Sequence, residues 1–358
     1  MRASIITMTS TYNYGATLQA FALQEFVKKL GVDCNLIDHM SAPEKHRKIK
    51  LLNFSKKNLR MLPYKFALQR GYRRFEDFYD KNMNMSRRYE SMDALKTAPP
   101  SSDVFISGSD QVWNPRDPKI DRFLLDFVPD DKLKISYAAS MGDPSLPEEV
   151  KKKYVRALER FDSISVREAE AQSMIAPLTD KEVHIHCDPA FLLSAEEWRK
   201  YESPVKGLEP GSYILCYMIH MPPWYDSWIK DIKKKTGKKI VFVGLNGVRK
   251  ITCDKFVRDA GPGEFLWLID HADTVISSSF HGNVFSLIFG KTLISTPDKK
   301  RPDRIKNLLR RFGQNHREMY DATVDYCTAA VDHDAIEEIA KEERERSKQY
   351  LKSIFDRV

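Results

Sequence analysis

Short apolar segments alternate with longer segments whose apolar residues recur at helical spacing, and the alternation continues along most of the chain. In the first repeat, residues 4–7 suit a buried strand, residues 18–30 suit a helix that Gly31 ends, and residues 34–38 suit a second strand. Such a succession makes a right-handed βαβ unit with a parallel sheet. The alternation resumes at Tyr213, so we predict an α/β protein of two Rossmann-like lobes that face a cleft.

The length of 358 residues suits about two domains. We place an N-terminal lobe at 1–202 and a C-terminal lobe at 211–330, because the residues between them are rich in Pro and Gly. A charged helix is expected at 334–358, with packing back on the N-terminal lobe as one option. The N-terminal lobe is interrupted by a basic helical excursion at about 44–95.

The excursion is strongly basic between Glu44 and Arg74, where Glu44 is the only acid and apolar residues are interleaved with lysines and arginines. Such a segment suits either an amphipathic surface for anionic lipid or a charged glycan, or a solvated helix that covers the core. The lipid surface would place the protein at the inner face of the cytoplasmic membrane. We favour the covering helix, because charged helical faces are most often simply solvated.

Composition excludes several classes of protein. No apolar run reaches the roughly 18 residues of a membrane-spanning helix, and no signal-peptide pattern is present at the N-terminus. The five cysteines are scattered without a Cys-x-x-Cys pair, which favours a reducing cytoplasm. The net charge of +8 is modest for 358 residues, so we expect no nucleic-acid partner.

One segment combines a strand, a polar turn and a helix in a way that suits an anion. Residues 274–276 read as a buried strand, Ser279 to Gly282 form the turn, and an apolar run then continues to Gly290. Free backbone N–H groups and the helix dipole at such a start favour a phosphate or carboxylate. His281 stands there, where an imidazole can pair with the anion or move a proton. The alternative is a capped core helix with a hydrogen-bonded histidine.

Ligands of parallel α/β sheets bind beyond the carboxyl ends of the strands, and that rule selects a set of residues. Arg167 offers a planar fork for a carboxylate or phosphate, although an ion pair with Glu168 or another acid is an equal alternative. Asp110 suits a general acid or base, or a turn residue. Trp113 suits a flat surface for a sugar ring, or ordinary packing. The remaining residues at these ends are Asn13, Tyr14, Gly15, Gly108, Ser109, Ser279 and Gly282.

The sequence contains no strong metal or nucleotide motif. His184, His186 and Asp188 alternate along one strand, but no fourth ligand accompanies them, so we expect no metal. Neither a Gly-x-Gly-x-x-Gly fingerprint nor a phosphate-binding Gly-Lys-Ser loop is present, which disfavours dinucleotide and P-loop chemistry.

Several of these segments, taken together and in order, resemble the polysaccharide pyruvyl transferase family. The similar segments are 13–24, 108–114, 137–140, 165–168, 188–189 and 279–282, followed by Arg304-Ile305 and Leu308-Leu309. The resemblance implies a fold like that of the GT-B glycosyltransferases. It also implies transfer of pyruvate from phosphoenolpyruvate, as donor substrate without a cofactor, to two hydroxyls of a sugar, with release of phosphate.

The resemblance further implies that His281 and Arg167 contact phosphoenolpyruvate. Arg304 belongs to the matching C-terminal pattern, and Asn283 stands where the family commonly has Thr, which could alter the lining of the pocket. Forming the ketal requires an acid for the enol carbon and a base for the attacking hydroxyls. We assign His281 as the acid and either Asp110 or Glu168 as the base.

Two other functions remain open from the sequence, and nucleic-acid binding by the basic excursion comes third. A GT-B glycosyltransferase that uses a nucleotide-sugar donor would have the same architecture. A non-catalytic glycan-binding protein would also fit, although the presence of His281 and Arg167 argues against it. For the transferase, the acceptor is expected to be a cell-surface or exopolysaccharide glycan or its precursor, either lipid-linked or nucleotide-linked.

Overall fold

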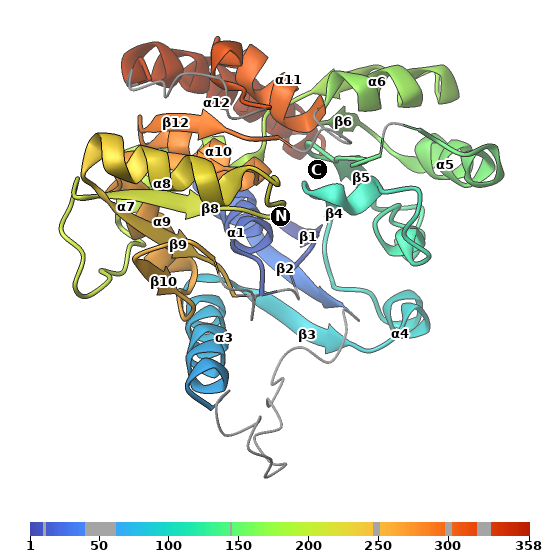
Figure 1. Ribbon diagram of the computed structural model, residues 1–358. Coiled ribbons are helices and arrows are strands. Elements are labelled where there is room, and N and C mark those ends of the chain that lie inside the picture. The colour runs from blue at the N-terminus through green and yellow to red at the C-terminus, as the bar shows by residue number, and fades with distance from the viewer. Residues whose placement is uncertain (10–11, 40–61, 144, 246–250, 298–302, 321–330) are drawn as a thin grey trace. The chain divides into compact units, whose positions relative to one another are not determined.

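The computed structural model describes the chain except for residues 10–11, 40–61, 144, 246–250, 298–302 and 321–330 (Figure 1). The chain divides into two compact units. Unit 1 comprises Met1–Glu44, Asn82–Leu193 and Ile339–Val358, and unit 2 comprises Lys45–Lys81 and Ser194–Glu338. Among the described helices, none is both long enough and apolar enough to cross a membrane.

Unit 1 is built on a parallel five-stranded sheet in the order β3-β2-β1-β4-β5. Its strands are β1 (Arg2–Ile6), β2 (Asp33–His39), β3 (Met85–Tyr89), β4 (Val104–Ser107) and β5 (Leu133–Ser136). A parallel pair, β6 (Ile164–Val166) and β7 (Val183–Ile185), continues beyond β5 through single bridges at Ile135–Ser163 and Ala139–Val166. The chain order therefore reverses between β1 and β4, which makes their carboxyl ends the expected place for a ligand.

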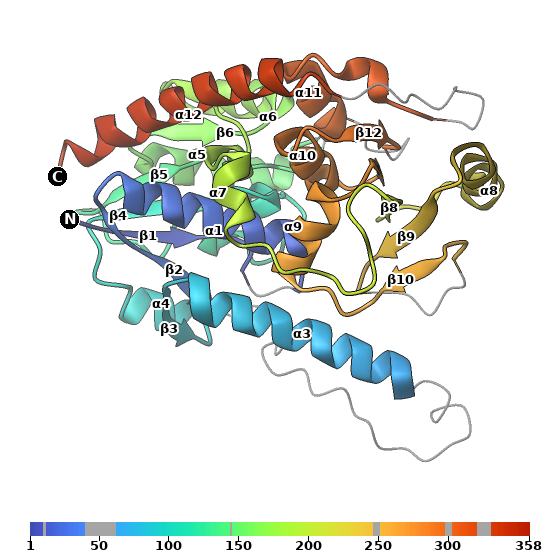
Figure 2. The ribbon, with the colours of Figure 1, turned by 90° about the vertical axis from the view of Figure 1, so that its left-hand side faces the viewer.

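Helices cover this sheet because their apolar faces pack on it. The helices of unit 1 are α1 (Tyr14–Lys29), α4 (Met92–Thr97), α5 (Glu148–Arg160), α6 (Ala169–Ile175) and most of α12 (His333–Phe355), with 3₁₀ turns at Gln111–Trp113, Ile120–Arg122, Ala176–Leu178 and Pro189–Leu192. Helix α1 lies along β1 and β2 (Figure 2). It begins at Asn13, whose side chain accepts a hydrogen bond from the Ala16 amide.

Unit 2 repeats the same strand order, β10-β9-β8-β11-β12, again with all neighbours parallel. Its strands are β8 (Tyr213–Tyr217), β9 (Lys239–Val243), β10 (Lys255–Val257), β11 (Thr274–Ser277) and β12 (Thr292–Ser295). Its helices are α3 (Leu62–Asn82), α7 (Ala195–Arg199), α8 (Tyr225–Thr236), α9 (Pro262–Asp270), α10 (Phe280–Ile288) and α11 (Asp303–Arg311), with a 3₁₀ turn at Asn315–Arg317. The reversal of order falls between β8 and β11.

Helix α3 carries the described half of the basic excursion and packs on unit 2. Arg74 lies within 3.1 Å of the Glu264 carboxylate and donates to the Asp259 carbonyl oxygen at 2.6 Å. Close packing also explains Gly71, where a Cβ atom would lie 2.8 Å from Leu245. Helix α3 thus covers a folded unit, but the rest of the described excursion is not helical throughout, because it contains β3 of the unit 1 sheet and the start of α4. Residues 44–61 of the excursion lie outside the described range.

The C-terminal helix α12 contributes its residues from Ile339 onward to unit 1. The Tyr350 hydroxyl donates to the Ser136 carbonyl oxygen at 2.9 Å, and the hydroxyls of Tyr137 and Ser347 lie 2.8 Å apart. These buried contacts tie the helix to the end of β5.

Candidate functional site

The carboxyl edge of the unit 1 sheet brings several of the predicted site residues together. Beyond the named strands, single parallel bridges join Asp110 to Ala139 and Ala139 to Val166. The Ser140 amide donates to the Asp110 carbonyl oxygen at 3.0 Å, and the Arg167 amide donates to the Ala139 carbonyl oxygen at 3.1 Å. The segments that follow β4, β5 and β6 therefore run side by side. Asp110 has φ = 70°, a backbone strain of the kind that clusters at functional sites.

Arg167 is buried here in two ion pairs. Its Nε lies 3.0 Å from Glu168 Oε1 and its Nη1 lies 2.7 Å from Asp188 Oδ2, while its side chain is only 3% exposed. Burial acts to lower the pKa of Arg167, but the carboxylates of Glu168, Asp188 and Asp110 outweigh burial and leave the pKa raised. We call Asp110, Arg167, Glu168 and Asp188 the acidic row. Three carboxylates and one guanidinium give it a net charge of about −2 at neutral pH.

Arg167 therefore forms the ion pairs that the sequence analysis gave as the alternative to binding a carboxylate or phosphate. The guanidinium is oriented by protein carboxylates on two sides, so Arg167 fixes Glu168 and Asp188 in place. The sequence placed Arg167 and Glu168 side by side, but it offered no sign that Asp188 would complete the pair.

The two carboxylate oxygens of Glu168 differ in their hydrogen bonds. Its Oε1 accepts hydrogen bonds from Ser140 Oγ at 2.5 Å and from Arg167 Nε at 3.0 Å. Its Oε2 is buried and has no hydrogen-bond partner within the described part of the chain. A buried carboxylate oxygen in this state needs a donor, and a substrate hydroxyl or a water would supply one.

A second group of unsatisfied polar atoms lies where β1 and β4 end. Thr7 Oγ1 donates to the Ser109 carbonyl oxygen at 2.7 Å and accepts from Gln19 Nε2 at 3.0 Å. Among the described residues, Gln19 Oε1 and Ser109 Oγ find no partner, although both side chains are fully buried. Burial lowers the pKa of the adjacent His39 to about 4 despite its hydrogen bond to the Thr7 carbonyl, so this imidazole is neutral.

The sequence predicted Ser109 but missed Gln19, Thr7 and His39. Gln19 lies within the segment that resembles the family, yet a glutamine inside a helix carries no signal of its own. Of the other predicted residues, Tyr14 and Gly15 are buried in the first turn of α1. Gly108 is tightly packed, because a Cβ atom there would lie 3.0 Å from the Thr7 side chain.

Trp113 was wrongly predicted as a surface for a sugar ring. It is fully buried in the core of unit 1, where its ring meets Phe161 edge to face. Its Nε1 donates to Ser107 Oγ at 3.1 Å, so the indole is satisfied without a ligand. Ordinary packing, the alternative given for Trp113, is what the structure shows.

The corresponding position of unit 2 is the start of α10. Ser279 caps the helix by accepting from the Gly282 amide, and the first turn contains no acidic residue. Ser278 Oγ accepts hydrogen bonds from the amides of Ile219 and His220 at 2.9 and 3.0 Å, which joins the turn after β8 to the turn after β11. These hydrogen bonds therefore hold the start of α10 in place beyond β8 and β11, the two strands between which the strand order reverses.

Three more predicted residues belong to this helix start. His281 lies in the first turn of α10 and is 8% exposed. Gly282 has no room for a side chain, because a Cβ atom would collide with Ser277 Oγ. Asn283 is fully buried and donates from Nδ2 to the Ser279 carbonyl oxygen at 2.7 Å, so it braces the helix start. Arg304 is half-buried on α11, a helix that packs on α10.

The predicted site residues thus fall into two groups, each within one unit. Unit 1 holds Asp110, Arg167 and Glu168 in one hydrogen-bonded cluster, and unit 2 holds His281 at a helix start that carries no negative charge in its first turn. The strand-face residues His186 and Asp188 are already engaged, by Ser165 Oγ at 2.7 Å and by Arg167 respectively.

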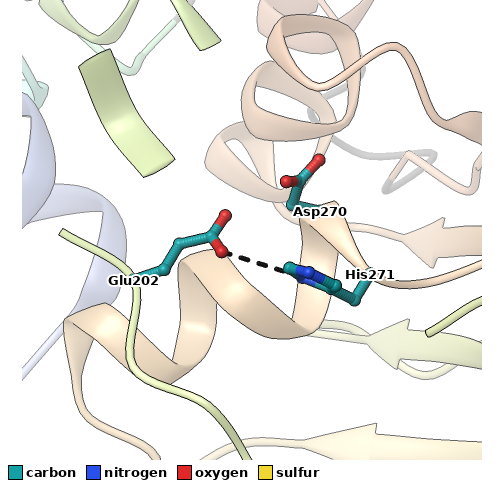
Figure 3. A group of neighbouring side chains, drawn as sticks. All are labelled: Glu202, Asp270 and His271. Carbon is teal, nitrogen blue, oxygen red and sulfur yellow. Dashed lines mark ion pairs between the residues drawn. The ribbon is translucent and has the colours of Figure 1, made fainter. Parts of the chain in front are cut away.

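Unit 2 also contains a carboxylate and histidine cluster that the sequence did not indicate (Figure 3). Glu202, Asp270 and His271 each place one ligand atom within 4.8 Å of the others. Arg199 holds Asp270 with two hydrogen bonds of 2.8 and 3.1 Å, and Lys291 lies 3.8 Å from the same carboxylate. The cluster is therefore already balanced by cations, which disfavours a metal ion there.

Comparison with known proteins agrees with the fold and defines the family. A family model described as polysaccharide pyruvyl transferase matches residues 13–296, most of the chain. The chain belongs to the polysaccharide pyruvyl transferase family. Membership makes it a transferase and implies a glycan acceptor. A search of curated proteins gives no match.

Solved structures similar to this family member are enzymes with a GT-B-like fold. UDP-GlcNAc 2-epimerase from Neisseria meningitidis, bound to UDP-GlcNAc, has a TM-score of 0.56 and 10% identity over 99% of this chain and 100% of its own. The epimerase from Rickettsia bellii has a TM-score of 0.51 and 10% identity, with coverage of 98% and 97%. At such identities the likeness establishes the two Rossmann-like halves and nothing about substrates.

Proposed function

We propose that this family member transfers pyruvate from phosphoenolpyruvate to two hydroxyls of a glycan or its precursor, forming a cyclic ketal and releasing phosphate. The observation that carries the proposal is the start of α10, where His281 lies in a capped first turn without acidic residues. A helix start of this kind favours an anion, and phosphoenolpyruvate carries a phosphate and a carboxylate.

In the proposed reaction His281 gives a proton to the methylene carbon of phosphoenolpyruvate, which becomes the methyl group of the ketal. One acceptor hydroxyl attacks the adjacent carbon and loses its proton to Glu168 or Asp110. The second hydroxyl attacks the same carbon as phosphate leaves with the second proton. The proton held by the base returns to His281 through solvent, so the enzyme is restored.

The test is binding of phosphoenolpyruvate to the His281→Ala variant, measured by calorimetry. We expect the affinity to fall at least about 10-fold, which corresponds to the loss of about 1.4 kcal/mol of binding free energy. His316→Ala is the matched control, because His316 is an exposed histidine of the same unit. Unchanged affinity in His281→Ala would remove this residue from the donor site.

A glycosyltransferase that uses a nucleotide-sugar is the second candidate, since an α-glucosyltransferase in complex with UDP and DNA has a TM-score of 0.50 and 12% identity, covering 98% of this chain and 95% of its own. Thermal unfolding with each donor separates the two candidates. Ligand binding to the folded state raises the unfolding temperature, so phosphoenolpyruvate should raise it and UDP-GlcNAc should not. The reverse result would favour the glycosyltransferase.

A further inference from the structure

We propose that the outward face of the first turns of α3 binds the surface of an anionic lipid bilayer. This face consists of the exposed residues Pro63, Phe66, Arg70 and Arg73, and we call it the cationic face. The proposal goes beyond the proposed function and does not depend on the donor. Three observations support it: the distribution of charge along the chain, the two different sides of α3, and the kind of apolar residue found among the bases.

The positive charge of the protein is concentrated in one stretch of sequence. Of the 58 lysines and arginines, 11 lie between Lys45 and Arg74, and this stretch contains no aspartate or glutamate. The rest of the chain has the remaining 47 basic residues against 50 acidic ones, a net charge of −3. The net charge of +8 therefore comes entirely from this stretch. Basic clusters of this kind are typical of segments that lie on anionic lipid headgroups.

Helix α3 has two sides with different roles. Its inner side packs in the fold, as the sequence analysis favoured, through the buried residues Gly71, Tyr72, Phe75, Phe78 and Tyr79. Phe66, Arg70 and Arg73 follow one another at spacings of four and three residues, so they share one side of the helix. Phe66 is 57% exposed, and the side chain of Arg70 is 62% exposed. The covering role therefore leaves the cationic face open to a partner.

Packing on unit 2 accounts for only part of the charge on α3. Arg74 pairs with Glu264 and Asp259, and Arg70 lies 2.8 Å from the same Asp259 carboxylate. Arg73 forms no ion pair with the described residues of the chain. Three guanidinium groups thus meet two carboxylates, which leaves a positive excess. The helix dipole does not explain that excess, because it favours acids in the first turn, and the first turn of α3 has none.

The apolar residues among the bases favour lipid over nucleic acid. Between Lys45 and Arg74 most of them are leucine, isoleucine or methionine, which suit the boundary between headgroups and acyl chains but cannot stack on bases. Phe66 can enter the headgroup layer while the neighbouring guanidinium groups pair with lipid phosphates. The next exposed residue on this side is Asp77, which an anionic surface repels. Only the first turns of α3 are therefore expected to lie on lipid.

The experiment is co-sedimentation of the full chain with vesicles made either of phosphatidylglycerol mixed with phosphatidylcholine or of phosphatidylcholine alone. We expect wild type to partition at least about 10-fold more strongly to the anionic vesicles than to the neutral ones. Partitioning should weaken as the salt concentration rises, because salt screens exposed charges. Equal partitioning to both kinds of vesicle, or none to either, overturns the proposal.

Variants of the cationic face test which residues bind. Each cation near an anionic surface contributes roughly a five-fold gain in partitioning, so we expect Arg73→Gln to weaken it about 3- to 5-fold. Phe66→Ser should weaken it at least about 3-fold, and the double variant at least about 10-fold, because the ring no longer enters the headgroup layer. Both side chains are exposed, so the unfolding midpoint should stay that of wild type. Wild-type partitioning of the double variant overturns the proposal.

Matched controls come from elsewhere on the surface. Ile219→Ser changes an exposed apolar residue of unit 2 outside α3, and Lys152→Gln removes an exposed base of unit 1. Both controls should partition within about 2-fold of wild type, because neither lies on the cationic face. Losses in the controls as large as those in Phe66→Ser and Arg73→Gln would show that the face is not specific, and would overturn the proposal.

Nucleic acid is the competing partner, and a duplex DNA and a single-stranded RNA are tested in the same buffer. Binding of either that requires Phe66 and Arg73, without binding of anionic vesicles, would overturn the proposal and assign the face to nucleic acid. His281→Ala separates this inference from the proposed function. This variant should lose phosphoenolpyruvate but partition to anionic vesicles like wild type, since His281 lies on α10 and not on α3.

Discussion

Glu202 and Asp270 lie close together in unit 2, and their side chains are only 10% and 9% exposed (Figure 3). Ionising both carboxylates there therefore costs free energy. Burial raises the pKa of Glu202 from 4.5 to about 7, and the charge of Asp270 adds to that rise, while Arg199 and Lys291 oppose it. The pKa of Asp270 is lowered, because Arg199 outweighs its burial. At mildly acidic pH the pair therefore holds one proton, mainly on Glu202.

The raised pKa of Glu202 predicts that the stability of the folded protein depends on pH. A carboxyl whose pKa is higher in the folded state binds its proton more tightly when folded, so its stabilising effect is complete below about pH 4.5 and is lost as the pH rises through about 7. The slope is at most about −1.4 kcal/mol per pH unit within that window. We expect the free energy of unfolding of the wild type, measured with urea, to fall between pH 5 and pH 7.

Glu202→Gln removes the titrating group and should flatten this part of the profile. Glu196→Gln is the control, because Glu196 is an exposed glutamate in α7 of the same unit. Equal pH slopes in wild type and Glu202→Gln would show that the proton is held elsewhere.

Single residues of the candidate site were only partly predictable. Candidate site residues could be selected at the strand ends, because parallel strands present their carboxyl ends at one edge of the sheet. The residues selected in this way were glycines, acids and a histidine. Whether a selected side chain faces a ligand or the core depends on partners distant in sequence. Asp188 reaches Arg167 across 21 residues, and Trp113 turns into the core toward Phe161, neither of which a local pattern can show.

At the scale of elements, α3 shows how a charged helix can be structural. Its position as a helix could be predicted from apolar spacing, but its partner could not, because Arg74 meets Asp259 across 185 residues of chain. Some of the elements missed from the sequence are short or polar: β3, β10 and α7 carry too few apolar residues for a period to stand out.

The docking of α3 predicts a stability effect. Arg74→Ala removes an ion pair to Glu264 and a hydrogen bond to the Asp259 carbonyl, and leaves the buried Glu264 carboxylate without its cation. We expect a loss of about 1–3 kcal/mol in the free energy of unfolding, measured with urea. Arg73→Ala on the exposed face of the same helix should change it by less than about 0.5 kcal/mol. Equal effects of the two variants would contradict this docking.

At the scale of the whole molecule, the repeated α/β alternation was enough to predict two Rossmann-like halves. Each half has the strand order third, second, first, fourth, fifth, which places one reversal point in each sheet. The units interleave in sequence, since α3 belongs to unit 2 and most of α12 to unit 1. Such interleaving depends on long-range packing, which a hydrophobic period does not encode.

The proposed donor site makes a prediction for the intact chain. If the donor binds at the start of α10, phosphoenolpyruvate should slow amide hydrogen exchange in Phe280–Ile288 by about 10-fold or more, because bound ligand protects the amides it engages. The His281→Ala variant should lose the protection, while Glu168→Gln should keep it. Protection that spares α10 would remove the start of this helix from the donor site.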